Sequence, residues 1–182
     1  SASCAIFVSE EKLHKDRKHL NIPYAVKYRG GIVTTDPVSE GNLDPEGNGL
    51  QMAIQKVMAQ ESIRNLSFIT AQGVGLKAFD YLTAKAIDKA GLRRVPVNSF
   101  EGNFGHSSGS TSLMNCILGA KALEEGVILP TLGHTNLGTK SRIQVVTSIK
   151  KSGKNSFLNV SAGLGGVNAV TLYTKEKIHH AY

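Results

Sequence analysis

A lone imidazole in a small, polar turn is the first place in this sequence where chemistry could be done. In the segment EGNFGHSSG, Gly102 and Gly105 flank a phenylalanine and His106 follows directly. The glycines predict a sharp break after a strand, and the residues beyond His106 predict a helix. A helix N-terminus carries partial positive charge, which disfavours the imidazolium and keeps the ring neutral.

Glu101 opposes that effect, because a carboxylate close to an imidazole favours its charged form. The sequence leaves the balance between the two open. A neutral His106 could accept a proton or donate a hydrogen bond to a developing oxyanion. The alternative is a histidine that faces solvent or caps a helix and has no chemical role.

Two further glycine-containing turns could contribute to the same site. The turn AQGVG carries Gln72, and the turn SAGLGGVNA carries Leu164, Gly165, Gly166 and Asn168. Backbone N–H groups in such a glycine-rich turn can hold an oxyanion or a carbonyl oxygen. The alternative is a plain strand-to-strand turn in which glycine serves only to reach positive φ.

The elements that must position these turns alternate along the chain. The patterns predict strands at 4–8, 24–33, 66–71, 94–100, 143–149, 156–162 and 168–174, and helices at 50–63, 78–91 and 107–126. Strands that alternate with helices indicate an α/β fold with parallel strands, and the short final connections indicate antiparallel pairs as well. In open α/β sheets ligands collect at strand ends of the kind that carry these three turns.

Length and charge narrow the class of protein. The 182 residues suit one domain, 1–182, and the formal net charge is +7. The basic residues are scattered; the densest cluster, 12–18, contains Asp16 and no interleaved aromatic residues. We therefore expect no nucleic-acid binding, and interpret 12–18 as a solvated helix face or a docking patch for an acidic partner.

Cys4 and Cys116 are too few for a disulfide framework and lack metal-ligand spacing. We expect structural roles for both, no metal, and a reduced, cytoplasmic location. The apolar run near Cys4 is too short for a signal peptide, and no stretch approaches the length of a membrane span, so no membrane association is expected.

Three segments, in order and in register, resemble the C-terminal half of a β-ketoacyl synthase. NFGHSSGSTSLMNCILGAKALEEGVILPT is similar to the family's lysine-to-GH segment, FITAQGVGLKAFD to its N.HGT.T..GD segment, and NVSAGLGGVNAVTLY to its NSFGFGGTNA segment. SASCAIFVSEEKLHKDR looks like the strand and loop with which that half begins. The resemblance covers nearly the whole chain and implies half of a thiolase-like fold, a mixed five-stranded sheet with helices on both faces.

The resemblance also implies a reaction. In that family a cysteine in the N-terminal half takes an acyl chain from an acyl carrier protein, and two histidines help to decarboxylate the malonyl unit and steady its thioester oxygen, without a cofactor. The second histidine corresponds to His106, and the first to Gln72, an amide that cannot exchange a proton near neutral pH. Neither Cys4 nor Cys116 falls at the position of the nucleophile.

Other positions depart from the family pattern. The family lysine falls on Glu101, a reversal of charge, and the gating phenylalanine on Leu164. Ala162 replaces an earlier aromatic residue, and Thr83 replaces a helix acid, while Asp80 is kept. Gln72 and His106 are thus the candidate catalytic residues, and the candidate substrate-binding residues are Glu101, Leu164, Gly165, Gly166 and Asn168.

This eroded set resembles a non-catalytic partner, such as a chain-length factor. The leading hypothesis is a ketosynthase-like subunit in fatty-acid or polyketide assembly that completes an acyl-condensing site with a cysteine-bearing N-terminal half or subunit and an acyl carrier protein. One half of the fold alone would expose its central helix face, which marks an interface. The alternative is a non-catalytic acyl-binding or structural scaffold that pairs with itself as a homo-oligomer.

Overall fold

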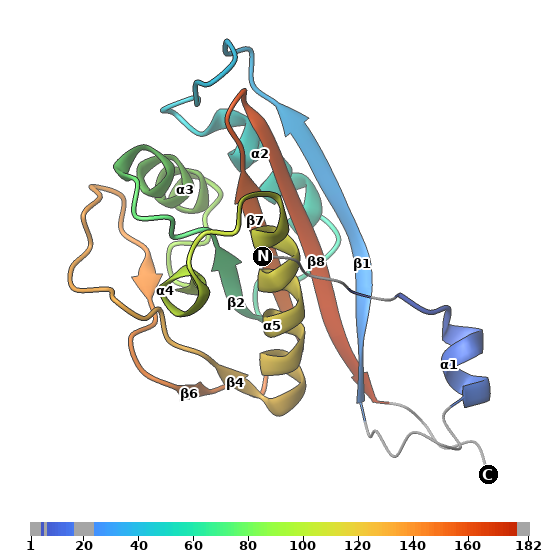
Figure 1. Ribbon diagram of the computed structural model, residues 1–182. Coiled ribbons are helices and arrows are strands. Elements are labelled where there is room, and N and C mark those ends of the chain that lie inside the picture. The colour runs from blue at the N-terminus through green and yellow to red at the C-terminus, as the bar shows by residue number, and fades with distance from the viewer. Residues whose placement is uncertain (1–4, 6, 17–23, 178–182) are drawn as a thin grey trace.

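A mixed β-sheet with helices on both faces forms the body of the protein (Figure 1). The computed structural model describes residue 5 and residues 7–16 and 24–177. The main sheet has the strand order β1-β8-β7-β2-β3-β5. Its strands are β1 (Tyr24–Thr35), β2 (Leu66–Ala71), β3 (Pro96–Asn98), β5 (Gln144–Val145), β7 (Ser156–Ala162) and β8 (Val167–Lys177). A separate antiparallel ribbon pairs β4 (Val127–Ile128) with β6 (Lys150–Lys151).

The direction of the strands determines at which edge of the sheet the three glycine-containing turns lie. β7, β2, β3 and β5 run parallel, whereas β8 is antiparallel to both of its neighbours, β7 and β1. The turns that follow β2, β3 and β7 therefore leave the sheet at one edge. The residues that precede the four parallel strands lie at the opposite edge.

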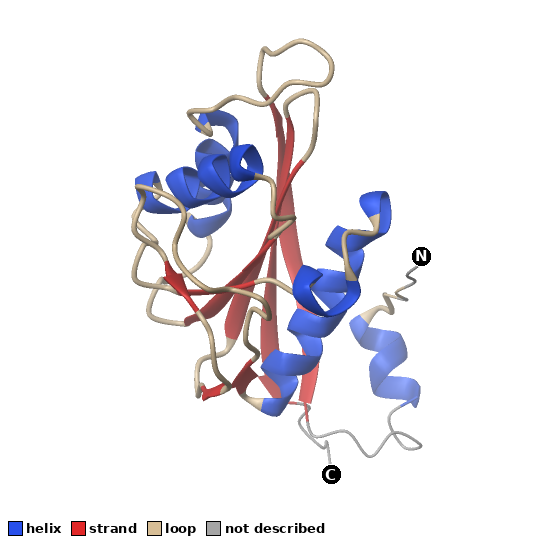
Figure 2. Cartoon of the chain, turned by 60° about the vertical axis from the view of Figure 1, so that its left-hand side comes forward, coloured by secondary structure: helices blue, strands red, loops and turns tan. Residues whose placement is uncertain are grey.

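The helices lie in two layers, as the turned view in Figure 2 shows. α2 (Asn48–Met58) and α3 (Lys77–Lys89) cover one face of the sheet, and α5 (Thr111–Glu125) covers the other. Two short helices, α1 (Glu10–Asp16) and α4 (Glu101–Phe104), and a 3₁₀ turn at Ser108–Ser110 complete the described elements. On α1, within the basic cluster 12–18, Lys12 and Lys15 are exposed, and Lys15 Nζ lies 2.6 Å from a Glu11 carboxylate oxygen.

Amphipathic spacing explains the first layer. Leu50 and Ile54 of α2 and Ile87 of α3 are fully buried against Ile69 and Leu158 of the sheet. Burying side chains of this size stabilises a fold by roughly 1.5–3 kcal/mol each. The periodic apolar pattern of these two helices therefore fixes their position on the sheet.

Aromatic rings and one glycine explain the second layer. The Phe68 and Phe157 rings stack with centroids 5.1 Å apart, and the Phe157 and Tyr173 rings stack at 4.8 Å. Gly119 of α5 lies directly on Phe157: a Cβ built there would be 2.5 Å from the ring atom Cε2. The missing side chain is what lets α5 approach the sheet.

Cys116 belongs to this second core. It is 8% exposed, and its sulfur accepts hydrogen bonds from the Tyr173 hydroxyl at 3.2 Å and the Asn159 amide at 3.0 Å. Burial raises the pKa of the Cys116 thiol. These contacts agree with the structural role expected for Cys116, whereas Cys4 lies outside the described residues.

The predicted α/β class, mixed sheet and two-sided helix cover are confirmed, but the main sheet has six strands rather than five. Of the strand expected at 4–8, the described residues 5, 7 and 8 are not in a strand, and the strand expected at 143–149 shortens to Gln144–Val145. The helix expected at 107–126 begins only at Thr111. Ser108 has φ 52° and breaks the helical path before it.

Substituting Gly119 with alanine should destabilise the fold by about 1–3 kcal/mol, because the new methyl group forces α5 away from Phe157. Gly109→Ala is the matched control, since nothing lies within 4 Å of a Cβ there and its φ is not positive. Urea unfolding measures both. Equal stability of the two variants would contradict this account of how α5 packs.

Because the sequence has only two cysteines, Cys4→Ser leaves Cys116 as the single thiol. We expect that thiol to resist alkylation by iodoacetamide in the native protein and to react fully in 6 M guanidinium, since it is buried and its pKa is raised. Mass spectrometry measures the modified fraction. Rapid native alkylation would show that Cys116 is accessible.

Candidate functional site

The turns after three neighbouring parallel strands meet at one edge of the sheet. Gln72 follows β2, and its side-chain oxygen accepts a hydrogen bond of 3.1 Å from the backbone N–H of Ala162, the last residue of β7. On the other side of β2, a Cβ at Gly73 would lie 2.7 Å from the hydroxyl oxygen of Ser99, which follows β3. The Gln72 turn therefore joins the other two turns.

Glu101 lies buried beside this junction. Its carboxylate accepts a hydrogen bond from the Ser99 hydroxyl, and the Asn115 amide lies 3.5 Å from its second oxygen. Burial raises the pKa of Asp80, and the charge of Glu101 raises it further. Within the described part of the chain, neither acid forms an ion pair with a lysine, arginine or histidine. The site thus holds a pair of acids where the resemblance implies a lysine.

His106 is exposed, and residues 107–110 separate it in the sequence from the helix that was expected to begin beside it. α4 ends at Phe104, Gly105 turns the chain at φ 73°, and α5 begins at Thr111. Nδ1 of His106 nevertheless lies 3.4 Å from the hydroxyl of Thr111, the first residue of α5.

Glu101 and His106 are the two side chains whose mutual influence the sequence left open. The Glu101 carboxylate turns inward to Ser99 and Asn115. No ion pair joins Glu101 to His106 among the residues that the structure describes. His106 is thus an exposed imidazole, while Glu101 is buried.

The third turn is fastened to the loop that follows β1. The Gly165 N–H donates to the Asn42 carbonyl at 2.9 Å, and the Gly163 N–H to the Val167 carbonyl at 2.7 Å. Gly166 has φ 82°, and a Cβ there would lie 2.7 Å from the Asp36 carbonyl oxygen. Two of the glycine N–H groups are therefore already used inside the fold. Leu164 projects from the tip of the turn, 61% exposed.

Asn168, a candidate substrate-binding residue, is buried against Asp36. Its amide donates to Oδ2 of Asp36 at 2.7 Å and to the Gly166 carbonyl at 3.0 Å. The other Asp36 oxygen accepts from the Gly49 N–H at 2.8 Å, in the first turn of α2. These hydrogen bonds connect the turn at Gly163–Gly166 to Asp36.

A cleft of about 320 Å³ opens beside the junction of the turns. It lies between the first turns of α3 and the loop 131–139. Polar residues that line it include Gln72, Asp80, Thr83, Ser99, Thr131 and His134. Sequence reasoning missed Ser99 and the loop 131–139. Ser99 lies inside the predicted strand 94–100, whereas the observed strand already ends at Asn98. The loop carries no motif.

The described residues contain neither a metal-binding group of side chains nor a helix that could span a membrane. No group of three or more histidine, cysteine, aspartate and glutamate side chains is placed to hold a metal ion there. None of the described helices is long and apolar enough to cross a membrane.

Comparison with known proteins gives a consistent family. The family described as "Beta-ketoacyl synthase, C-terminal domain" matches residues 24–135. The chain is 27% identical over 179 residues to the tetracenomycin polyketide synthase ketoacyl synthase alpha subunit of Streptomyces glaucescens, a match that covers 95% of this chain and 42% of that protein. It is also 27% identical over 173 residues to 3-oxoacyl-[acyl-carrier-protein] synthase 2 of Mycobacterium bovis, covering 93% of this chain and 41% of the relative.

The fold agrees with these sequence matches. The structure of the ishigamide ketosynthase/chain length factor superposes with a TM-score of 0.73 at 24% identity, covering 81% of this chain and 37% of that one. The chain spans about two fifths or less of the length of the curated relatives it matches. Its architecture is that of the C-terminal half of the ketosynthase thiolase fold.

The contact between Asn168 and Asp36 predicts a charge-swap experiment. Asn168→Asp should cost about 3–5 kcal/mol, because it places two carboxylates together in a buried site. Asp36→Asn should cost about 1.5–3 kcal/mol, since it loses a charged acceptor. The double variant should recover at least about 1 kcal/mol through the reversed hydrogen bond. Denaturant unfolding of all four proteins measures the coupling, and simple additivity would contradict it.

Proposed function

Because the chain belongs to the β-ketoacyl synthase C-terminal domain family, we propose that it completes an acyl-condensing site in fatty-acid or polyketide assembly together with a cysteine-bearing N-terminal half. That half is carried either by the same polypeptide or by a partner subunit. The role proposed for this chain is a degenerate one, similar to that of a chain-length factor.

The hydrogen bond of Gln72 to Ala162 is the observation that carries this proposal. An amide neither takes up nor releases a proton near neutral pH, so Gln72 cannot act as a general acid or base. Its oxygen is committed to the β7 backbone, where it holds two turns together. This is a positioning role rather than a chemical one.

Glu101 supports the same conclusion. A buried carboxylate that accepts from Ser99 and Asn115, with Asp80 nearby, places two acids beside the junction of the turns. Such a pair disfavours the negative charge that develops when a malonyl unit loses carbon dioxide, because like charges in a buried site repel. An efficient decarboxylation centre would need the opposite sign.

His106 keeps a limited chemical capacity. It is exposed on the side of the molecule that the proposed N-terminal half would cover, and its ring can donate a hydrogen bond to a thioester oxygen. Leu164, exposed at the tip of the glycine turn, would border the acyl chain. Gly165 and Gly166 would shape the backbone beside it.

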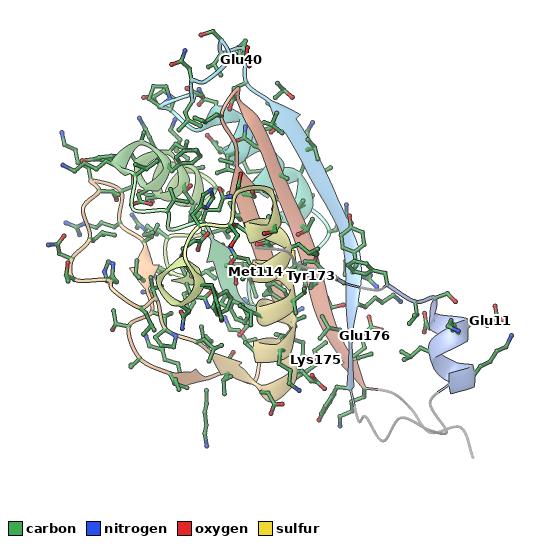
Figure 3. All side chains as sticks on the ribbon, viewed as in Figure 1. Glu11, Glu40, Met114, Tyr173, Lys175 and Glu176 are labelled. Carbon is green, nitrogen blue, oxygen red and sulfur yellow. The ribbon has the colours of Figure 1, made fainter. Side chains whose placement is uncertain are left out.

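The outer side of α5 supports the need for a second half. Ile117 is 38% exposed, Met114 and Leu118 are partly exposed, and Phe104 of α4 is 56% exposed. Figure 3 places Met114 on α5, in the same region of the molecule as Tyr173 of β8. An apolar helix face of this kind is typical of a surface that another protein layer covers.

Two further elements of the proposal follow from the family. An acyl carrier protein would deliver the acyl group, and the assembly would work in the cytoplasm without a cofactor. The second candidate function is a non-catalytic acyl-binding or structural scaffold that pairs with itself, and the same Gln72 and Glu101 contacts favour it.

The test uses the assembled protein with its cysteine-bearing half and malonyl-loaded carrier protein. If His106 works in the site, His106→Ala should slow decarboxylation and condensation by about 100-fold or more, whereas His106→Asn, which keeps a donor, should lose less. Asn103→Ala, an exposed neighbour, is the control.

Two outcomes decide between the candidates. Full activity of His106→Ala would favour the scaffold, with chemistry supplied elsewhere. An assembly that neither binds nor transfers acyl groups from the carrier would contradict the proposed function itself.

A further inference from the structure

The edge of the sheet opposite the candidate site collects basic side chains that are far apart in the sequence. Arg64 precedes β2 by two residues, Arg94 precedes β3 by two, Arg142 precedes β5 by two, and Lys154 precedes β7 by two. We name this edge the basic rim; its members are Arg64, Arg93, Arg94, Arg142, Lys150, Lys151 and Lys154, all exposed.

The register of the strands places these residues together. Pro96 lies opposite Gln144, so Arg94 and Arg142 share a level across β3 and β5. Beside β2, Lys154 donates from Nζ to the Leu66 carbonyl at 3.0 Å. The β6 lysines are held nearby, because the hydroxyl of Ser152, which follows them, bonds the Ser67 hydroxyl of β2 at 2.7 Å. β4 and β6 mark this end of the molecule in Figure 1.

The ion pairs of the described chain do not involve the rim. Ion pairs there occupy other basic residues: Lys15, Lys27, Arg29, Lys85, Lys89 and Lys121. No rim residue forms a salt bridge with any acid in residues 7–16 or 24–177. The rim carries seven positive charges, equal to the whole surplus of +7 in the sequence.

The spacing of these charges selects the geometry of a partner. Neighbouring strands lie about 4.8 Å apart, so the level pairs Lys154 with Arg64 and Arg94 with Arg142 are each spaced at roughly that interval. Between the two pairs the level shifts by two residues, because Ile69 lies opposite Val97. Acidic side chains one helical turn apart are about 5–6 Å apart. The four parallel strands span three such intervals, about 14 Å, which corresponds to about ten residues of helix at 1.5 Å per residue.

The surroundings of the rim favour a protein over other polyanions. Ile63, 44% exposed, adjoins Arg64, and Ile149, 66% exposed, adjoins Lys150, so apolar contacts flank the charges. No residue next to a rim residue in the sequence is tryptophan, tyrosine or phenylalanine, and single-stranded nucleic acid binding relies on such rings for base stacking. An amphipathic acidic helix matches both the row of charges and its apolar flanks.

We propose that the basic rim docks an acidic amphipathic helix of another protein, with carboxylates repeated at one-turn intervals over about ten residues. The docking surface is distinct from the site at Gln72. The six residues of β2 separate the two edges by about 20 Å. The helix therefore anchors a partner to the assembly and does not itself reach the reacting groups.

The test measures binding of a fluorescent 18-residue helical peptide, with glutamate at one-turn spacing and leucine flanking it, by anisotropy at 50 mM salt. A peptide of the same composition with the glutamates scrambled is the comparison. We expect the patterned peptide to bind at least tenfold more tightly and to weaken as salt rises, because exposed charges are screened.

Variants locate the site of binding. Arg64→Glu and Arg142→Glu should each weaken the patterned peptide by about tenfold, whereas Lys77→Glu, the same change of charge at the other edge beside the cleft, should not. Circular dichroism shows whether the variants keep their fold; should Arg142→Glu unfold, Arg64→Glu alone decides.

Four outcomes would overturn the proposal: no binding at low salt, equal binding of the scrambled peptide, indifference to the rim substitutions, or tighter binding to a DNA duplex or to vesicles with 30% anionic lipid. None of these measurements depends on acyl chemistry. Failure here is therefore distinguishable from failure of the proposed condensing role.

Discussion

One buried carboxylate holds together the end of the molecule on which the candidate site depends. Asp36 is 7% exposed, and its two side-chain oxygens accept hydrogen bonds from the first turn of α2 and from Asn168 of β8. Its backbone N–H donates to the Gly166 carbonyl at 2.9 Å. A carboxylate at a helix N-terminus is stabilised by the helix dipole and by free N–H groups there, so it tolerates burial without a cation.

The positions of Gln72, Ser99 and Glu101 follow from the hydrogen bonds of Asp36 and from the parallel strands. With the glycine turn fixed, the end of β7 presents the Ala162 N–H to Gln72, and Gln72 lies over the end of β2. Glycine at 73 lets Ser99 approach, and Ser99 in turn holds Glu101. The same loop that Asp36 begins reaches its tip at Glu40, far from Lys175 and Glu176 at the other end of the sheet (Figure 3). The candidate site and the basic rim thus lie at opposite ends of the same parallel strands.

Local patterns in the sequence were sufficient to predict the positions of the three turns. They did not predict the long-range hydrogen bonds that fix those turns. Glycine spacing after β-type runs placed Gln72, His106 and Leu164 at strand ends, because such signals act within a few residues. The partner of Asn168 lies 132 residues away, so its burial on Asp36 has no local signal. The start of α5 was predicted four residues too early, because nothing in residues 107–110 indicates that Ser108 has a positive φ. The basic residues of the rim are scattered in the sequence. They come together only because the parallel strands that follow them all begin at the same edge of the sheet.

The family assignment and the residues at positions 72 and 101 lead to opposite expectations for this chain, and the proposed second half reconciles them. An amide at 72 and a buried acid at 101 leave His106 as the one histidine of the resemblance, so a complete condensing centre must draw its nucleophile from elsewhere. The most direct measurement is native mass spectrometry of the complex that contains this chain, isolated from its source cells, with every component identified. The account predicts a ketosynthase N-terminal half with its nucleophilic cysteine, either continuous with this chain or bound to it. A complex that contains only copies of these 182 residues would contradict it.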